Sequence, residues 1–178
     1  MRRDGICIES GRLLICGLDE SDLDGLTAMR NDHRIYRFEP SFLAELQGSP
    51  DEAMKALMSM ELERDRQCIL GIYEKLRPGI LIGLAELYDY KPTGKVISIG
   101  YRIRPGYWGN GIGTECVAAL TGYLRQNTAV SLITAHVLPA NKASSRILIK
   151  NGFEHLVTKS EDWGKETLVC ADVYTFDC

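Results

Sequence analysis

The chain has 178 residues, of which 45% are hydrophobic and 25% charged, and its formal net charge is −3. This length predicts a single domain over residues 1–178 with enough apolar material for a core. Acids and bases are mixed along the chain, so nothing indicates a nucleic-acid surface. No segment reaches the roughly 18 apolar residues of a membrane span. No apolar stretch follows the N-terminal arginines as in a signal peptide, so we expect a cytoplasmic protein.

The cysteine and histidine spacing gives no indication of a metal site. Six cysteines are scattered without any C-x-x-C pair, and the three histidines lie far apart in the sequence. We therefore expect free thiols in a reducing compartment and no bound metal.

A strand and a helix open the chain. The strand covers 11–18 (GRLLICGL), and the helix covers 19–32, where apolar residues recur at helical spacing. Ser21 and Asp24 have the spacing of a capping box at the start of this helix.

A second helix, over 49–65, has a sharper start signal. Ser49 can cap it, Pro50 suits its first position, and Glu52 can reach back to the cap. Its apolar face is rich in methionine, which indicates core packing, with a substrate-adaptable surface as the alternative.

Three strands follow, over 67–75, 79–90 and 95–104. Short turns with proline and glycine separate them, which predicts antiparallel hairpins.

Helices and strands alternate in the last third of the predicted order. We expect a helix over 114–127, a strand over 131–138, a helix over 140–153, and strands over 155–160 and 167–176. The strand over 131–138 is apolar on both faces, as in the interior of a sheet. His136 lies in this strand and is interpreted as a hydrogen-bonded core histidine, with catalysis as the alternative. Together these elements predict a mixed α/β sheet.

Residues 106–115 (GYWGNGIGTE) place Gly109, Gly111 and Gly113 directly before a helix. A helix N-terminus offers unpaired N–H groups and partial positive charge, and these glycines would let the amides of 110–114 face one anion. The stretch fits neither the Walker pattern nor the dinucleotide fingerprint. By glycine spacing alone, a pyrophosphate loop and a tight turn without a ligand both stay open.

The segment IGYRIRPGYWGNGIGTECV (99–117) resembles the acetyl-CoA motif of the GNAT superfamily of N-acetyltransferases. It is most similar to the RimJ/RimL branch, the ribosomal-protein N-terminal acetyltransferases, with Trp108 at the position that opens the pyrophosphate loop. VLPANKASSRILIKNGF (137–153) is similar to a second motif of that branch, and GRLLICGLDESDLDGL (11–26) resembles its usual opening. The resemblance covers nearly the whole chain.

The resemblance implies the GNAT fold, an α/β (α+β) architecture with a mixed, mostly antiparallel central sheet flanked by helices. The fourth and fifth strands, here 95–104 and 131–138, would splay apart around acetyl-CoA. Backbone groups of Arg102, Ile103 and Arg104 would pair with the pantetheine arm, and one N–H near Ile103 would face the thioester carbonyl.

The resemblance also implies the remaining contacts to acetyl-CoA. Asn141 would hydrogen-bond the pantetheine, although by itself it could be a turn residue. In the pyrophosphate loop that Trp108 opens and in the helix start that follows it, the cofactor-binding residues would be Gly109, Asn110, Gly111, Ile112, Gly113 and Thr114.

The reaction that the resemblance implies is direct attack of an amine on the thioester. Ser144 matches the serine that protonates the departing thiolate in this branch; a helix cap is the alternative. The glutamate that many relatives carry two residues before GY is replaced by Ser98. Glu86, on the preceding strand, is the candidate base, directly or through a water, and a solvated edge glutamate is the alternative.

The favoured function is an acetyl-CoA-dependent N-acetyltransferase acting on a primary amine, with a peptide or protein N-terminus as one candidate acceptor. The alternatives are a CoA-binding regulatory protein without turnover, a polyamine or antibiotic acetyltransferase, and a nucleotide-binding module. Residues 19–24 (DESDLD) are acidic enough to keep a polyamine open. We expect a monomer or homodimer and neither nucleic acid nor a membrane as partner.

Overall fold

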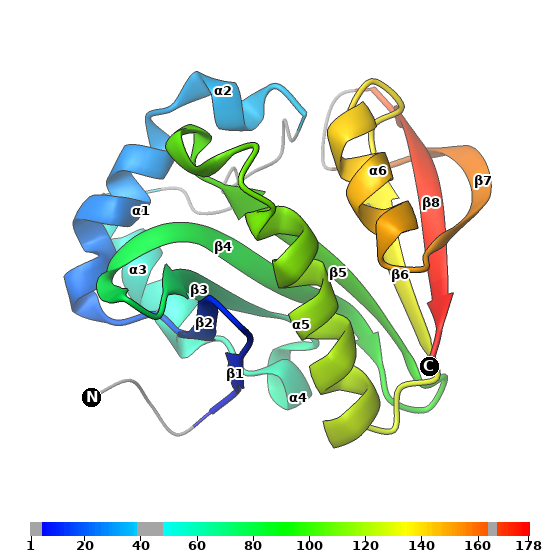
Figure 1. Ribbon diagram of the computed structural model, residues 1–178, viewed down its shortest axis with the longest axis horizontal. Coiled ribbons are helices and arrows are strands. Elements are labelled where there is room, and N and C mark those ends of the chain that lie inside the picture. The colour runs from blue at the N-terminus through cyan, green and yellow to red at the C-terminus, as the bar shows by residue number, and fades with distance from the viewer. Residues whose placement is uncertain (1–4, 39–47, 164–166) are drawn as a thin grey trace.

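The computed structural model describes residues 5–38, 48–163 and 167–178 (Figure 1). Within these residues the strands form one eight-stranded sheet in the order β1-β2-β3-β4-β5-β6-β8-β7. Only β5 and β6 pair in parallel; every other neighbouring pair is antiparallel. The strands are β1 (Cys7–Glu9), β2 (Leu13–Gly17), β3 (Cys68–Glu74), β4 (Arg77–Lys91), β5 (Val96–Ile103), β6 (Leu132–Val137), β7 (Glu154–Glu161) and β8 (Val169–Asp177). This architecture confirms the predicted fold class.

Helices cover both faces of the sheet. They are α1 (Leu23–Arg30), α2 (His33–Tyr36), α3 (Pro50–Ser59), α4 (Leu62–Asp65), α5 (Ile112–Asn127) and α6 (Lys142–Lys150), with short 3-10 turns at Glu20–Asp22 and Pro105–Tyr107. One apolar cluster packs α5 against the central strands, and a second packs α1 and α3 against the opposite face. Leu84 and Ala85 of β4 belong to different clusters, because successive side chains of a strand point to opposite faces. None of the helices in the described ranges is long and apolar enough to cross a membrane.

The start of α3 is as predicted. The Ser49 hydroxyl accepts from the Glu52 N–H at 3.3 Å, and the Glu52 carboxylate accepts from the Ser49 N–H at 2.8 Å. Met54 and Leu57 are buried in the second cluster, so the core interpretation of the methionine-rich face is confirmed for Met54.

The predicted capping box at the first helix was wrong by two residues. Asp19 and Asp22 form it instead: Asp19 accepts from the Ser21 N–H and Asp22 from the Asp19 N–H, both at 2.9 Å. Ser21 lies inside the 3-10 turn that leads into α1 and cannot act as the cap. The short strand β1 and the helix α2 were not predicted.

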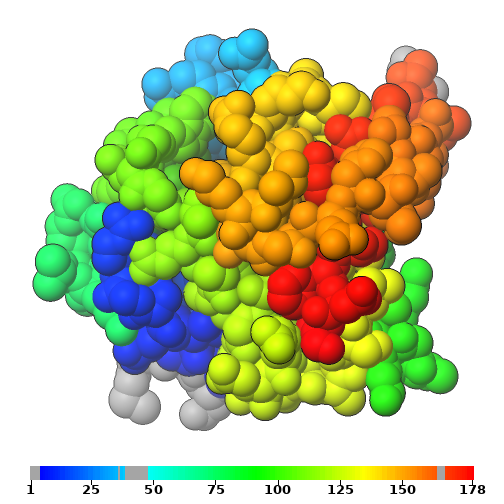
Figure 2. Space-filling model, turned by 45° about the vertical axis from the view of Figure 1, so that its right-hand side comes forward, coloured from blue at the N-terminus to red at the C-terminus, as the bar shows by residue number. Residues whose placement is uncertain are grey.

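The predicted splay lies between β5 and β6. The two strands pair only at Val96↔Leu132, Ile97↔Ile133 and Ser98↔Thr134, after which they diverge. Figure 1 shows them meeting near the C-terminus and separating away from it. Beyond β6, the edge strand β7 is exposed over almost its whole length, and Figure 2 shows it in orange on the surface beside α6.

Candidate active site

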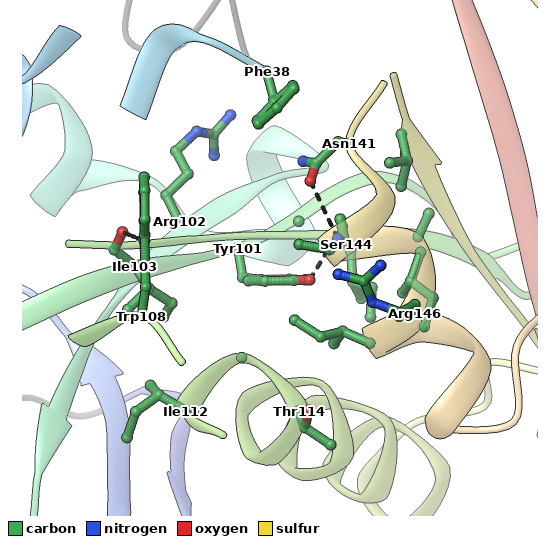
Figure 3. A pocket seen from close by; sticks show the side chains of 18 of the residues that line it. Phe38, Tyr101, Arg102, Ile103, Trp108, Ile112, Thr114, Asn141, Ser144 and Arg146 are labelled. Carbon is green, nitrogen blue, oxygen red and sulfur yellow. Dashed lines mark hydrogen bonds between the residues drawn. The ribbon is translucent and has the colours of Figure 1, made fainter. Parts of the chain in front are cut away.

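A cavity of about 520 Å³ lies where β5 and β6 separate, and it reaches the start of α5 and one side of α6. Most of the predicted site residues line it: Glu86, Arg102, Ile103, Gly109, Gly111, Ile112, Gly113, Thr114, Asn141 and Ser144. Arg104 and Asn110 are absent from the described residues of its wall. Figure 3 shows Tyr101, Ser144 and Asn141 converging from β5 and α6, with the start of α5 beside them.

The glycines before α5 are required by the local backbone and by close packing. Gly109 and Gly111 both have φ of +77°, a conformation that strains any residue with a Cβ. Gly113 lies in the first turn, where a Cβ would be 3.0 Å from Ile147 Cδ1 and 3.2 Å from Tyr101 Cε2. The result is a helix N-terminus held directly at the cavity.

A clamp formed by Arg12 and Glu115 braces this loop. Arg12 Nε donates to Glu115 at 2.6 Å, and its guanidinium also donates to the Asn110 carbonyl at 2.9 Å. The Arg12 N–H and the Ser10 hydroxyl donate to the other Glu115 oxygen at 2.6 and 2.7 Å. Burial would raise the pKa of Glu115, but these hydrogen bonds outweigh it and keep that pKa below its ordinary value. Sequence reasoning missed the clamp, whose two residues are 103 positions apart.

Replacing Arg12 by glutamine should raise the Kd for CoA about threefold to tenfold, because a charge-assisted hydrogen bond of about 1.5 kcal/mol or less to an exposed side chain is lost. Calorimetric titration of CoA would measure the change in Kd.

Since the pKa of Glu115 is depressed in the folded state, the contribution of this carboxylate to stability is present above the ordinary carboxyl pKa and declines on acidification. The titration should therefore be done at neutral pH. An unchanged Kd would show that the clamp does not contribute to CoA binding.

Of the three residues predicted to pair with pantetheine through their backbones, Arg102 in β5 and Arg104 directly after β5 turn their backbone groups away from the gap. The Arg104 N–H donates to the Ile82 carbonyl and the Arg104 carbonyl accepts from Tyr107, both at 2.9 Å. Backbone groups of a strand alternate between its two edges, so Arg102, two residues before Arg104 and opposite Leu84, also turns its N–H and carbonyl toward β4. The prediction was wrong for the backbones of Arg102 and Arg104.

Ile103 alternates with these two residues and turns its backbone toward the gap. Its carbonyl accepts from the indole Nε1 of Trp108 at 2.6 Å, so Trp108 ties the strand to the glycine loop. The Ile103 N–H, which the sequence nominated to face the thioester carbonyl, lies on the cavity side of β5.

The start of α6 separates the roles of Asn141 and Ser144. Asn141 is the cap, because its Oδ1 accepts from the Ser144 N–H at 3.2 Å, so the alternative of Ser144 as the cap was wrong. The Ser144 hydroxyl instead lies 3.1 Å from the Tyr101 hydroxyl. Burial raises the pKa of Tyr101 to about 12, so this phenol stays protonated at neutral pH. Tyr101 was missed, although the GY pair of the motif contains it.

Glu86 is a partly buried member of an ion pair. Its carboxylate contacts the Arg102 guanidinium, and the two side chains are 17% and 11% exposed, so the alternative of a solvated edge glutamate was wrong. Gly100, opposite Glu86, leaves room for this carboxylate, since a Cβ there would lie 3.0 Å from Glu86 Oε2.

His136 is hydrogen-bonded, as predicted, to Glu161. It is however a cavity residue as well, because its side chain lines the wall where β6 departs from β5.

The model of the acetyltransferase (GNAT) domain family matches residues 12–154. The chain therefore belongs to the GNAT family, and like its relatives it is an N-acetyltransferase. It is 25% identical to the uncharacterized N-acetyltransferase YoaA of Bacillus subtilis over 148 residues, which cover 83% of this chain and 82% of YoaA.

Two solved structures illustrate the likeness of fold. The ribosomal-protein alpha-N-acetyltransferase RimL, in complex with CoA, matches with a TM-score of 0.80 at 17% identity, over 97% of this chain and 98% of that one. Spermidine N-acetyltransferase from Vibrio cholerae, with CoA and spermine, matches with a TM-score of 0.77 at 16% identity, over 94% and 96%. At these identities the likeness establishes the fold and leaves the acceptor open.

Proposed function

We propose that this chain transfers the acetyl group of acetyl-CoA to the free α-amine of a peptide or protein. Acetyl-CoA is the acetyl donor of GNAT enzymes. The observation that carries the proposal is one continuous cavity, which joins the gap between β5 and β6 to the glycine-bounded start of α5.

The residues present fit the donor. At Gly109 a Cβ would meet nothing within 4 Å, so the backbone there is open to a phosphate, and the N-terminus of the 16-residue helix α5 favours an anion. Arg146 and Lys150 of α6 line the same cavity and supply positive charge. The backbone of Ile103, at the edge of β5 that faces the gap, and the side-chain amide of Asn141 would hold the pantetheine arm.

In the proposed reaction the amine nitrogen attacks the acetyl carbon, a C–N bond forms, and the C–S bond breaks. The Ile103 N–H would donate to the carbonyl oxygen as negative charge develops there. The Ser144 hydroxyl would donate a proton to the departing thiolate. Glu86, the base nominated from the sequence, is already neutralised by the Arg102 guanidinium, which favours a role in orienting the acceptor.

The charges of the cavity wall favour an acceptor with few positive charges. Among the described lining residues the formally charged ones are Arg34, Arg102, Arg146, Lys150 and Glu86, four basic and one acidic. Arg146 and Lys150 would be neutralised by the donor, and the one lining carboxylate, Glu86, is already paired with Arg102. A polyamine would therefore find no carboxylate left for its several charges among the described lining residues, whereas a peptide N-terminus brings one amine. The α-amine, with a pKa of about 7.7–8.0, is also far more often neutral at pH 7 than a lysine side chain with a pKa of about 10.4.

A comparison of three amines tests the acceptor: a peptide with a free N-terminus, an N-blocked lysine peptide and spermidine. We expect kcat/KM for the free N-terminus to exceed the other two by at least about tenfold, or 1.4 kcal/mol. Thiol release from acetyl-CoA is the readout, and hydrolysis without amine is its control. A preference for spermidine would overturn the acceptor assignment. Binding of CoA without thiol release from any amine would instead identify a regulatory protein.

The cytoplasm is the compartment that we propose. Cys16, Cys68 and Cys116 are buried and form no disulfide, and burial raises the pKa of Cys68 and Cys116 to about 12. Unreactive buried thiols are usual in a reducing environment.

A further inference from the structure

His136 presents an imidazole ring to the cavity from β6. Its side chain is 18% exposed, and its Nδ1 lies 2.8 Å from each carboxylate oxygen of Glu161. The ring of Tyr88, from β4, lies 6.4 Å away between centroids and forms part of the same wall. His136 thus lies on the far side of the gap from Ile103.

Glu161 is placed behind the ring. It is absent from the described cavity-lining residues, and its side chain is 12% exposed. Besides His136, it accepts from the indole of Trp163 at 3.0 Å and pairs with the Lys159 ammonium at 3.1 Å. Burial opposes ionisation of Glu161, but hydrogen bonds from Trp163, His136 and Lys159 outweigh it and hold its pKa below the ordinary value. The Glu161 carboxylate is therefore ionised and accepts hydrogen bonds from the groups around it.

An ionised carboxylate only accepts hydrogen bonds, so the neutral ring carries its proton on Nδ1. The lone pair is then on Nε2, for which the described residues provide no hydrogen-bond partner. We propose that His136 Nε2 is the general base for the acceptor amine and that Glu161 is the positioning residue that fixes the tautomer. This assignment rests on the proposed acetyl transfer.

The other candidate bases are occupied. Glu86 contacts the Arg102 guanidinium. Ser98, at the position where many relatives carry a glutamate, has no basic group, and its hydroxyl hydrogen-bonds that of Thr134 at 2.7 Å. Histidine is the side chain that serves most often as a general base in enzymes.

The proton balance of the step is simple. As the amine nitrogen bonds to the acetyl carbon and the C–S bond breaks, the proton that the nitrogen loses goes to His136 Nε2. The imidazolium returns this proton to solvent. Ser144 supplies the proton of the thiol and regains one from solvent, directly or through the Tyr101 hydroxyl 3.1 Å away.

The test is His136→Asn, because an asparagine amide can still donate to Glu161 from near the Nδ1 position but has no group at Nε2. With the fastest of the three amines above, kcat/KM should fall about 100-fold or more, the usual contribution of a general base. The Kd for acetyl-CoA should stay unchanged. Glu161→Gln should give a smaller loss, because the ring remains but its tautomer is no longer fixed.

A pH profile separates a base from a structural histidine. The ratio of wild-type to His136→Asn kcat/KM cancels the acceptor's own titration. It should be constant at high pH and fall about tenfold per pH unit once the imidazole is protonated. The other ionisable groups around the ring are Glu161, Lys159, Tyr88, Glu86 and Arg102.

His155→Asn is the matched control. His155 lies on β7, pairs with Asp172 at 3.5 Å and is 45% exposed, outside the described cavity wall. It should keep wild-type activity. A folded His136→Asn with wild-type kcat/KM, or a ratio independent of pH, would overturn the assignment while acetyl transfer stands. A wild-type enzyme that releases no thiol with any of the three amines would overturn both.

Discussion

Replacing Gly111 by valine is expected to raise the Kd for acetyl-CoA by about tenfold or more, equal to about 1.4 kcal/mol. Gly111 is the residue before α5 and has φ of +77°, where a β-branched side chain is strongly strained. Relief of that strain rotates the peptide planes at the start of α5, which line the cavity and which we propose to hold the pyrophosphate. A Cβ at Gly111 would also lie 3.4 Å from the Arg12 guanidinium and disturb the clamp.

Gly113→Val should act on the same binding step for a different reason. Its conformation is helical, but the added Cβ would press on Ile147 and Tyr101. Either α5 moves away from β5 or these side chains move into the space that we propose for the pantetheine arm. Both changes weaken acetyl-CoA binding.

Gly122→Ala is the control within the same helix. A Cβ at Gly122 would meet nothing within 4 Å, and alanine favours a helix over glycine by about 0.5–1 kcal/mol. This variant should unfold at a higher temperature and bind acetyl-CoA as the wild type does. Calorimetric titration gives the Kd of each variant, and circular dichroism checks the fold. A folded Gly111→Val with wild-type affinity would contradict the pyrophosphate assignment.

Features that depend on neighbours in the sequence were predicted well. The capping box of Ser49 and Glu52 is complete within four residues. The spacing of the glycines indicates the loop before α5, where Gly109 and Gly111 have positive φ. Where the local signal is ambiguous, as among Asp19, Ser21, Asp22 and Asp24, several residues have capping side chains. Only the position at which the backbone turns into the helix decides between them.

Features that depend on strand register or on distant partners were missed. The edge that the Arg104 backbone faces depends on its pairing with β4, and a shift of one residue would reverse it. The partner of Arg12 lies 103 positions away and that of His136 lies 25 away. No periodicity links such pairs. The sequence therefore favoured a core role for a histidine in an apolar strand, and only the structure shows its contact with Glu161 and its place in the cavity wall.

Ser144→Ala is expected to lower kcat by about tenfold and leave the Kd for acetyl-CoA nearly unchanged. The helix keeps its start, because Asn141 caps it and the Ser144 N–H is the group that is capped. What is lost is the hydroxyl that we propose to protonate the leaving thiolate, and loss of such a contact lowers kcat rather than affinity. The loss is limited because a thiol with a pKa of about 8.5 is a fair leaving group without help.

Ser145→Ala is the matched control for Ser144→Ala. Ser145 is the next residue of α6, its hydroxyl lies 3.4 Å from the Asn141 carbonyl, and it is absent from the described cavity wall. Its removal should leave kcat unchanged. If Ser144→Ala changes only the Kd or the melting temperature, its hydroxyl has a structural role.

Tyr101→Phe then tests how Ser144 is held. The two hydroxyls are 3.1 Å apart, and Tyr101 stays protonated because burial raises its pKa to about 12. If Tyr101 orients Ser144, the phenylalanine variant loses part of kcat, and the double variant is no slower than Ser144→Ala alone. Losses in kcat that simply multiply would mean that Tyr101 acts on the reaction independently of Ser144.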